Sequence, residues 1–486
     1  MASFTDTFGA LSASLHGLVI SSILLPATFT SLFAGVLSDR LGRTRAIAIG
    51  AIFFAIGAAL EASASKLVMF IAGRCVVGIG EGAFLSTLLV YICEISPPKR
   101  RGALATLVQV FITVGLCVGY FMCYGTVRVP SSLSWRLPLA LQSGVAFILA
   151  AASCWYLPHS PRWLAYKGRR EEASLVWDKL GVSNAEREKD LLQNPTSMVN
   201  EAAAPTETAK VGLLQRMQRN LAASVEVFGK DTRKPMLLGV FMMAMQQLSG
   251  IDAVIYYAPL LFQQAGISSS EAAFLASGVS AILICVFTIL AVVFVDRWGR
   301  RPSTIYGGLV LFGCMALMAL LYATNSVHET YGIGRWAVVV AIYVFAIGYS
   351  TTWAIGMKLF ASEIQPVTTR ATATSLAQSA NCITNFFVAF ITPVLLSRSS
   401  SGAYFLFGGA LMLTVAVSVL CMPETRGRDL EAIGETFGLH KASDMPVVRG
   451  LTNLGSRIKR MVGTDRGPRR RFPEVETERI ELERRL

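Results

Sequence analysis

The segment Glu94-Ile-Ser-Pro-Pro-Lys-Arg-Arg101 recurs in the second half of the chain as Glu363-Ile-Gln-Pro-Val-Thr-Thr-Arg370. Each copy contains a glutamate, two residues, a proline, three residues and an arginine. A second charged motif precedes each copy, at Asp39-Arg-Leu-Gly-Arg43 and at Asp296-Arg-Trp-Gly-Arg300. Charged motifs that repeat between long apolar runs indicate a membrane protein of two related halves, and such internal duplication is typical of secondary transporters.

The composition places the chain in a lipid bilayer. Hydrophobic residues make up 53% of its 486 residues, charged residues make up 15%, and the mean hydropathy is +0.52. A soluble domain has about 25% charged residues, and a spanning helix needs about 20 mostly apolar residues. We therefore predict an all-α membrane protein with eleven spans, at residues 15–38, 45–65, 68–93, 102–125, 138–157, 236–262, 272–295, 303–323, 335–360, 372–396 and 402–422.

Basic residues gather in alternate loops. The net charge is +13, and lysines and arginines follow the first, third, fifth, seventh and ninth spans and fill the tail. The intervening loops contain few of them. This alternation predicts that the basic loops are cytoplasmic, and it explains the positive charge without a nucleic-acid partner.

No pattern in the chain indicates an enzyme, a metal or a cofactor. The nine cysteines fall in or beside apolar spans, without metal-ligand spacing. The segment Gly78-Ile-Gly80-Glu-Gly82 lies inside an apolar run, which favours close helix packing over phosphate binding. We therefore predict that the chain is not an enzyme and needs no cofactor.

A long polar stretch divides the chain. We predict four parts: an N-terminal bundle of five spans in 1–157, a cytoplasmic loop with amphipathic helices in 158–235, a C-terminal bundle of six spans in 236–422 and a cytoplasmic tail in 423–486. Residues 168–177 and 206–229 have helical patterns, and an unstructured linker is the alternative. Because duplicated halves should be equal, we expect a further span before residue 15, lost through a truncated or misassigned start.

Seven motifs in order resemble those of the sugar porter family of the major facilitator superfamily, from about residue 10 to 435. Besides the four above, they are Arg74-Cys-Val-Val-Gly-Ile-Gly80, Pro158-His-Ser-Pro-Arg-Trp-Leu164 and Pro423-Glu-Thr-Arg-Gly427. The resemblance implies the major facilitator fold, with two pseudo-repeated helix bundles and twelve spans, of which the first is absent here.

The charged motifs predict a gating network at the cytoplasmic helix ends. Carboxylates and guanidinium groups at facing helix ends form bidentate pairs. We expect such a network among Asp39, Arg43, Arg74, Glu94, Arg101, Asp296, Arg300, Glu363 and Arg370. The resemblance implies that this network is closed when the substrate site faces outward. Simple anchoring of topology is the alternative.

Polar side chains inside the spans predict the substrate site, because such groups are costly in lipid and usually face an internal cavity. Amides donate and accept hydrogen bonds at once, which suits a neutral polyhydroxylated ligand. The resemblance implies that sugar hydroxyls bind the glutamines and asparagines and that the tyrosines line an outer gate. The predicted substrate-binding residues are Gln109, Gln246, Gln247, Asp252, Tyr256, Tyr257, Lys358, Asn381 and Asn385. We predict that the helix bends at Gly250, since glycine weakens a helix.

Several positions depart from the family pattern. Asp252 and Ile284 stand where asparagines are usual, Trp353-Ala-Ile-Gly-Met-Lys358 lacks the usual proline and second tryptophan, and Cys382 replaces a tryptophan. The new charges of Asp252 and Lys358 predict a pair across the site or a shift of both toward neutrality. Such a pair could bind an acidic sugar or polyol acid, carry a proton, or be a static ion pair.

The sequence therefore predicts transport of a sugar, polyol or sugar acid by alternating access, in an integral membrane protein that we expect in the plasma membrane. A nutrient sensor and an exporter of small organic compounds are the alternatives. Proton coupling is left open, with Glu81 as a candidate carrier. The expected partners are the small molecule, protons if transport is coupled, and the lipid bilayer.

Overall fold

The computed structural model describes residues 2–96, 101–182, 228–229, 232–266, 270–327, 332–365, 370–399 and 401–426. These residues belong to one compact unit, Met1–Phe437. The first half contains α1 (Ala2–Phe8), α2 (Ala13–Ser21), α3 (Leu24–Leu41), α4 (Arg43–Ser63), α5 (Leu67–Ile95), α6 (Arg101–Thr126), α7 (Leu133–Trp155), α8 (Pro161–Tyr166) and α9 (Arg170–Lys179). The second half contains α13 (Arg233–Leu248), α14 (Ile251–Tyr256), α15 (Ala258–Gln264), α16 (Ser270–Trp298), α17 (Arg300–Ala323), α18 (Gly334–Glu363), α19 (Arg370–Arg398) and α20 (Gly402–Cys421).

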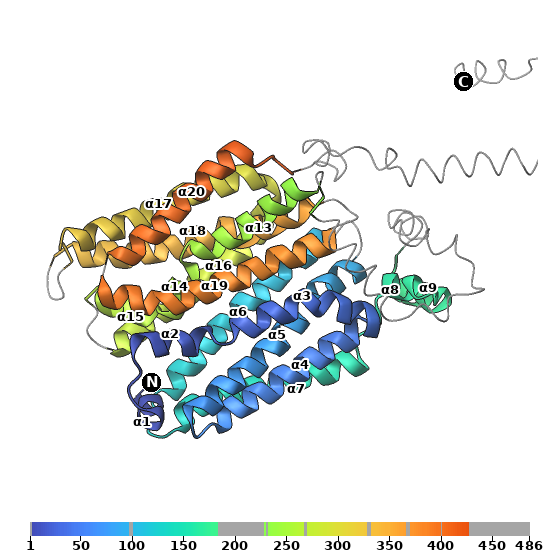
Figure 1. Ribbon diagram of the computed structural model, residues 1–486, viewed down its shortest axis with the longest axis horizontal. Coiled ribbons are helices and arrows are strands. Elements are labelled where there is room, and N and C mark those ends of the chain that lie inside the picture. Colours follow the sequence, from blue (N-terminus) through green and yellow to red (C-terminus); the bar gives the residue numbers. More distant parts are fainter. Residues whose placement is uncertain are drawn as a thin grey trace, which may run out of the picture. The chain divides into compact units, whose positions relative to one another are not determined.

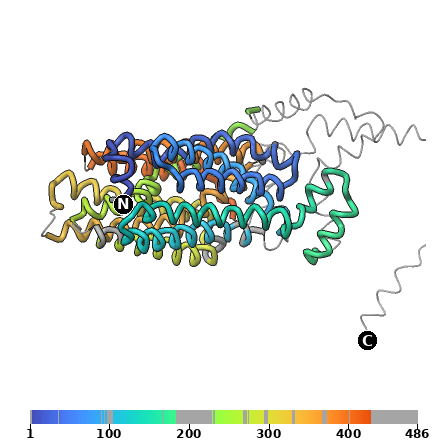
Figure 2. Tube along the Cα trace, turned by 90° about the horizontal axis from the view of Figure 1, so that it is seen from below, coloured from blue at the N-terminus to red at the C-terminus, as the bar shows by residue number. Residues whose placement is uncertain are grey.

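Eleven stretches of the described residues are long and apolar enough to cross a membrane, as predicted. They differ from the predicted ranges mainly at their ends. The first, Ala13–Gly35, comprises α2 and most of α3. The sixth, Arg233–Tyr256, comprises α13 and α14. The long helices run side by side, with α8 and α9 beyond one end (Figures 1 and 2).

Close packing of small residues holds the first half together. α4 packs against α5 and α7, and α3 packs against α5. A Cβ atom on Gly80 would collide with the backbone nitrogen of Phe54, and one on Gly78 or Gly82 would collide with a carbonyl oxygen of α3 or the residue before it. The glycines of this segment therefore allow close helix packing, as the sequence predicts.

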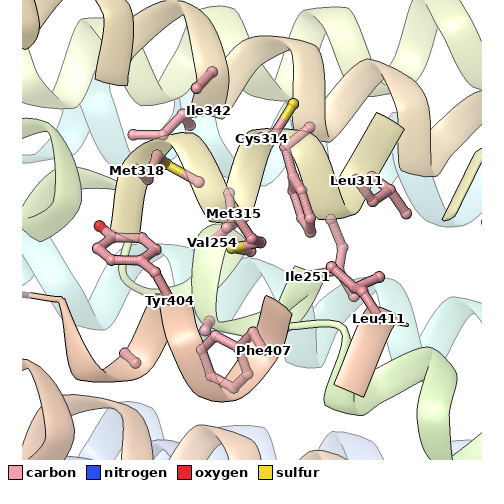
Figure 3. Packing of buried hydrophobic residues seen from close by; sticks show 14 of the residues in the cluster. Ile251, Val254, Leu311, Cys314, Met315, Met318, Ile342, Tyr404, Phe407 and Leu411 are labelled. Atoms are coloured by element: carbon pink, nitrogen blue, oxygen red, sulfur yellow. The ribbon is translucent and has the colours of Figure 1, made fainter. Parts of the chain in front are cut away.

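Large apolar side chains form the core of the second half. Figure 3 shows side chains of α14, α17 and α20 pointing toward one another, among them Val254, Met315 and Phe407. All three are almost fully buried. This core fixes the position of α14, which carries Asp252 and Tyr256.

The two halves meet along a few pairs of helices. α19 packs against α2 and α3, and α16 packs against α6. The hydroxyls of Ser31 on α3 and Ser379 on α19 lie 3.3 Å apart. Residues that face the space between the halves can therefore contact groups of both.

The short helices α8 and α9 form a small satellite beside the first half. Trp163, Leu164 and Trp177 belong to its apolar cluster. The Trp163 indole nitrogen donates to the Asp39 carbonyl oxygen at 3.0 Å, which attaches the satellite to the end of α3. Helix α9 confirms the helix predicted at 168–177. Of the second predicted helix, at 206–229, residues 206–227 lie outside the described residues.

Candidate functional site

A break in the sixth span positions the centre of the candidate site. α13 ends at Leu248 and α14 begins at Ile251, with Gly250 between them at φ +86°. Glycine adopts this left-handed conformation without the steric cost of a Cβ. The predicted break at Gly250 is therefore present, and it begins a separate short helix that carries Asp252 and Tyr256.

A network of side-chain amides joins α13 to α18 and α19. Asn381 Nδ2 donates to the Met243 carbonyl oxygen at 2.9 Å and to Gln246 Oε1 at 3.1 Å. Gln247 Nε2 donates to Asn381 Oδ1 at 3.0 Å, and Gln246 Nε2 donates to the Trp353 carbonyl oxygen at 2.8 Å. Gln246 is 0% exposed and Asn381 is 4% exposed. These two amides hold the network in place, while Gln247 keeps free hydrogen-bonding capacity.

Three buried oxygen atoms on three helices have no hydrogen-bond donor among the described residues. They are Gln247 Oε1 on α13, Asp252 Oδ2 on α14 and Asn385 Oδ1 on α19. A buried acceptor without a partner costs about 1–3 kcal/mol. All three atoms are acceptors, so a ligand that satisfies them must supply donors such as hydroxyl groups.

The two tyrosines of the span occupy different environments. Tyr257 is 2% exposed, and its hydroxyl donates to the Ala389 carbonyl oxygen at 2.7 Å. Tyr256 is 39% exposed, receives a 3.5 Å hydrogen bond from Asn385 Nδ2, and lies within electrostatic range of Glu81 and Arg74 of the other half. Tyr256 therefore faces the space between the halves, whereas Tyr257 stabilises the contact of α14 with α19.

Lys358 contacts the first half of the protein rather than Asp252. Its Nζ donates to Gln109 Oε1 on α6 at 3.0 Å. Asp252 lies within electrostatic range of Lys358, but the described residues include no ion pair between them within 4.0 Å. The pair predicted across the site is therefore not closed, because the lysine side chain extends to the glutamine of α6.

The missing proline leaves α18 unbroken, and its Trp353 is buried. α18 is continuous from Gly334 to Glu363, as expected without a proline. Trp353 is 0% exposed, and its indole nitrogen donates to the Thr304 carbonyl oxygen at 3.0 Å. This tryptophan therefore belongs to the helix interface and presents no open face to a ligand.

Tyr349 is a residue of the site that the sequence did not predict. Tyr349 on α18 lies within electrostatic range of Asp252 and Tyr256. Its signal in the sequence is a tyrosine inside an apolar span, but the same signal fits a ring at the lipid interface. Only the packing of α18 against α14 brings it to this site.

An ion-pair cluster connects the helix ends of the first half. Arg43 Nε and NH2 each donate to a Glu94 carboxylate oxygen at 2.9 Å, and Arg43 NH1 lies 2.7 Å from Asp39 Oδ1. A bidentate guanidinium–carboxylate pair is both strong and specific in geometry. This cluster joins α3, α4 and α5 within one half.

The second half has a related cluster with an additional carboxylate. Arg300 NH2 lies 3.1 Å from Glu363 Oε1, and the Thr425 hydroxyl donates to Glu363 Oε2 at 2.6 Å. Glu424 accepts the backbone N–H groups of Arg300 and Arg301 at 2.9 and 3.1 Å, which caps the N-terminus of α17. The sequence did not predict that Glu424 and Thr425 belong to this cluster, although both lie in the motif Pro423-Glu-Thr-Arg-Gly427.

The candidate spans of the described residues place the two clusters on one side of the bilayer. Six of the described spans separate Glu94, at the end of the third span, from Glu363, at the end of the ninth, and an even number of crossings returns the chain to the side it left. The side chains of Arg101, Asp296 and Arg370 lie outside the described residues. Among the described residues, each ion pair of the network stays within one half.

Arg74 does not belong to this network, which corrects the sequence prediction. It lies twenty positions before Glu94 on α5, or about 30 Å along a helix at 1.5 Å per residue. Its guanidinium donates to the Ile20 carbonyl oxygen at 3.4 Å and lies within electrostatic range of Glu61 and Glu81. The family motif does not specify how far along α5 each residue lies. Arg74 lies near the start of α5, far from the helix end that carries Glu94.

Glu424 leads to a testable prediction about stability. Burial opposes its ionisation, but the backbone N–H donors of Arg426, Arg300 and Arg301 outweigh burial and lower the pKa of the Glu424 carboxyl below 4.5. A lowered folded-state pKa stabilises the fold above the ordinary value, and this contribution is lost as the pH falls through the folded-state value. Glu424→Gln should therefore cost about 1 kcal/mol near neutral pH and progressively less below about pH 4.5.

Thermal unfolding in detergent across this pH range measures the difference in Tm. Asp6→Asn is the matched control, because Asp6 is an exposed carboxylate on α1. Equal Tm values for Glu424→Gln and the unmodified chain at neutral pH would contradict the capping role.

Comparisons with known proteins agree with this architecture. A protein-family model described as "Sugar (and other) transporter" matches residues 2–437. The chain belongs to the sugar transporter family. This family consists of transporters of the major facilitator type and not of enzymes. The predicted family and the prediction that the chain is not an enzyme are both confirmed.

Several relatives in the sugar transporter family cover most of the chain. An MFS-type transporter of Aspergillus cristatus is 31% identical over 88% of this chain and 86% of its own. A high-affinity glucose transporter of Kluyveromyces lactis is 30% identical over 89% and 77% of the two chains. Polyol transporter 5 of Arabidopsis thaliana is 31% identical over 87% and 78%.

Solved structures share the fold. The proton:xylose symporter XylE, bound to 6-bromo-6-deoxy-D-glucose, matches with a TM-score of 0.72 and 23% identity over 90% of this chain and 93% of its own. A partially occluded, inward-open form of XylE from E. coli matches with a TM-score of 0.67 and 23% identity, over 88% and 93%. The predicted major facilitator fold is thereby confirmed.

Proposed function

We propose that this protein carries a sugar or a related polyhydroxylated molecule across the plasma membrane by alternating access. Membership of the sugar transporter family supports transport of this general class. The relatives include proteins described as glucose and polyol transporters. The proposed substrate-binding residues are those predicted from the sequence: Gln109, Gln246, Gln247, Asp252, Tyr256, Tyr257, Lys358, Asn381 and Asn385.

The three acceptors without donors carry the proposal. Gln247 Oε1, Asp252 Oδ2 and Asn385 Oδ1 lie on three helices of the second half. A polyol has a hydroxyl on nearly every carbon, and each hydroxyl can donate one hydrogen bond and accept others. Such a molecule can satisfy several of these oxygens at once, which an apolar or singly polar ligand cannot do.

Two features support movement around this site. The span that carries Asp252 is already broken at Gly250, and discontinuous helices commonly form transporter substrate sites. The ion-pair clusters of Arg43–Glu94 and Arg300–Glu363 each tie together helix ends within one half. We propose that the halves rock as bodies and that Arg101, Asp296 and Arg370 complete contacts between them in the outward-facing state.

Uptake by proteoliposomes tests the proposal. Purified protein is reconstituted, and labelled hexoses, pentoses and linear and cyclic polyols are supplied one at a time. Saturable uptake of at least one of them above protein-free vesicles is the expected result. Absence of uptake and of counterflow for the whole panel would contradict a carrier and favour a sensor.

Proton coupling gives a second test of the same function. Glu81 on α5 lies within electrostatic range of Tyr256 and Cys382 in the second half, and among the described residues it forms no ion pair. Replacing a proton-carrying carboxylate with an amide should stop accumulation driven by a pH gradient and preserve exchange at equal pH. We therefore expect Glu81→Gln to abolish concentrative uptake and to retain counterflow.

The matched control is Glu171→Gln on α9, where the carboxylate is exposed. Gradient-driven accumulation by Glu81→Gln equal to that of this control would exclude Glu81 as the proton carrier.

A further inference from the structure

Four charged side chains lie around Tyr256 and Cys382, at the level where the halves meet. Arg74 and Glu81 come from α5, Asp252 from α14 and Lys358 from α18. Electrostatic interactions connect Tyr256 with three of them and Cys382 with Lys358, Asp252 and Glu81. Among the described residues, no two of the four form an ion pair within 4.0 Å.

Lys358 forms no ion pair within 4.0 Å among the described residues, although Asp252 lies within its electrostatic range. An ammonium group donates up to three hydrogen bonds, and the described residues supply one acceptor, Gln109 Oε1 at 3.0 Å. That acceptor is a neutral amide oxygen, so it does not balance the charge. A cation without a direct ion-pair partner is costly within a membrane span. Arg74 differs, because two carboxylates, those of Glu61 and Glu81, lie within its electrostatic range.

The complementary chemistry of the site follows from its two kinds of unsatisfied groups. Gln247 Oε1, Asp252 Oδ2 and Asn385 Oδ1 require donors, whereas Lys358 requires an acceptor, and an anion satisfies it best. A neutral sugar supplies the donors and leaves the ammonium charge unbalanced. A polyhydroxylated carboxylic acid supplies hydroxyl donors and a carboxylate in one molecule.

We propose that Lys358 binds the carboxylate of the transported molecule, so that the substrate class is sugar acids and polyol acids rather than neutral sugars. This inference rests on the proposed function. Gln109 orients the ammonium from the first half, so a bound carboxylate contacts a group that both halves position. Asp252 lies more than 4.0 Å from Lys358, and an extended substrate can place a hydroxyl at one and its carboxylate at the other.

Reconstituted full-length protein tests the proposal by paired uptake. Gluconate, glucuronate and quinate are compared with glucose, glucitol and inositol under the same conditions. The unmodified chain should favour an acid over its neutral counterpart. Lys358→Met should reduce that preference by roughly 10- to 100-fold, the range for a hydrogen bond to a charged group, and Lys358→Arg should retain much of it. Lys66→Met is the matched control, because Lys66 is exposed at the start of α5.

The outcomes separate this inference from the proposed function. Uptake of neutral sugars without uptake of any acid overturns the role of Lys358 and leaves the carrier function intact. An unchanged acid preference in Lys358→Met also overturns it. Absence of uptake for all six probes contradicts the carrier function itself.

A binding measurement keeps the proposal testable if the variants do not fold. The rise in Tm of the unmodified, detergent-purified protein is recorded with gluconate and with glucose at equal concentration. A larger rise with gluconate is expected, and an equal or smaller rise contradicts selection of the acid.

Discussion

Asn381→Ala is expected to lower substrate transport by about 100-fold, with the protein still present in the membrane. Asn381 bonds Met243, Gln246 and Gln247 at once. Its removal leaves two neighbouring glutamines with fewer partners, and losing a buried hydrogen bond costs about 1–3 kcal/mol. Gln247 then loses its fixed orientation, so one of the proposed substrate contacts is lost together with the network.

Initial uptake rates per reconstituted molecule measure this effect. Ser397→Ala provides the control on the same helix, since Ser397 is exposed and its hydroxyl donates only to the carbonyl oxygen of Val394. Uptake by Asn381→Ala within two- to threefold of this control would show that the amide network does not organise the site.

Gly250→Ala is expected to destabilise the protein by about 2–5 kcal/mol. The residue has φ +86°, which costs an L-residue with a Cβ about 1–2 kcal/mol. The new methyl group would also lie 2.7 Å from ring carbons of Phe407. Phe407 is 2% exposed within the core shown in Figure 3, so it has little room to move, and overpacking adds about 1–3 kcal/mol.

The Tm in detergent measures this loss. Gly313→Ala on α17 is the matched control, because a Cβ there meets no atom within 4 Å and alanine favours a helix over glycine. A Tm of Gly250→Ala as high as that of Gly313→Ala would contradict both the strain and the collision.

The spans and the bend were predictable because each depends on local sequence. An apolar run long enough to cross a bilayer leaves the chain few alternatives to a helix. Gly250 was predictable for the same reason, since glycine between two polar-rich stretches of an apolar span weakens the helix at that point. Such features require no knowledge of which helix lies next to which.

The partners of long side chains were not predictable from spacing. Lys358 and Asp252 have opposite charges and were expected to meet, but the lysine extends to Gln109 in the other half. Arg74 belongs to a charged family motif, yet helix geometry places it far from Glu94. Glu424 lies after the last span and caps α17, a contact between segments more than 120 positions apart. These contacts depend on helix depth and neighbours, which a single sequence does not specify.

Counterflow in proteoliposomes measures directly whether the acceptor oxygens of Gln247 and Asn385 bind a transported molecule, because exchange requires the substrate site and alternating access but no driving gradient. Vesicles are loaded with an unlabelled polyhydroxylated substrate identified by uptake, and entry of the labelled form is followed. Rapid exchange is expected for the unmodified chain and for Ser397→Ala, and loss of exchange is expected for Asn385→Ala combined with Gln247→Ala. Full exchange by this double variant would contradict the claim that these oxygens bind the transported molecule.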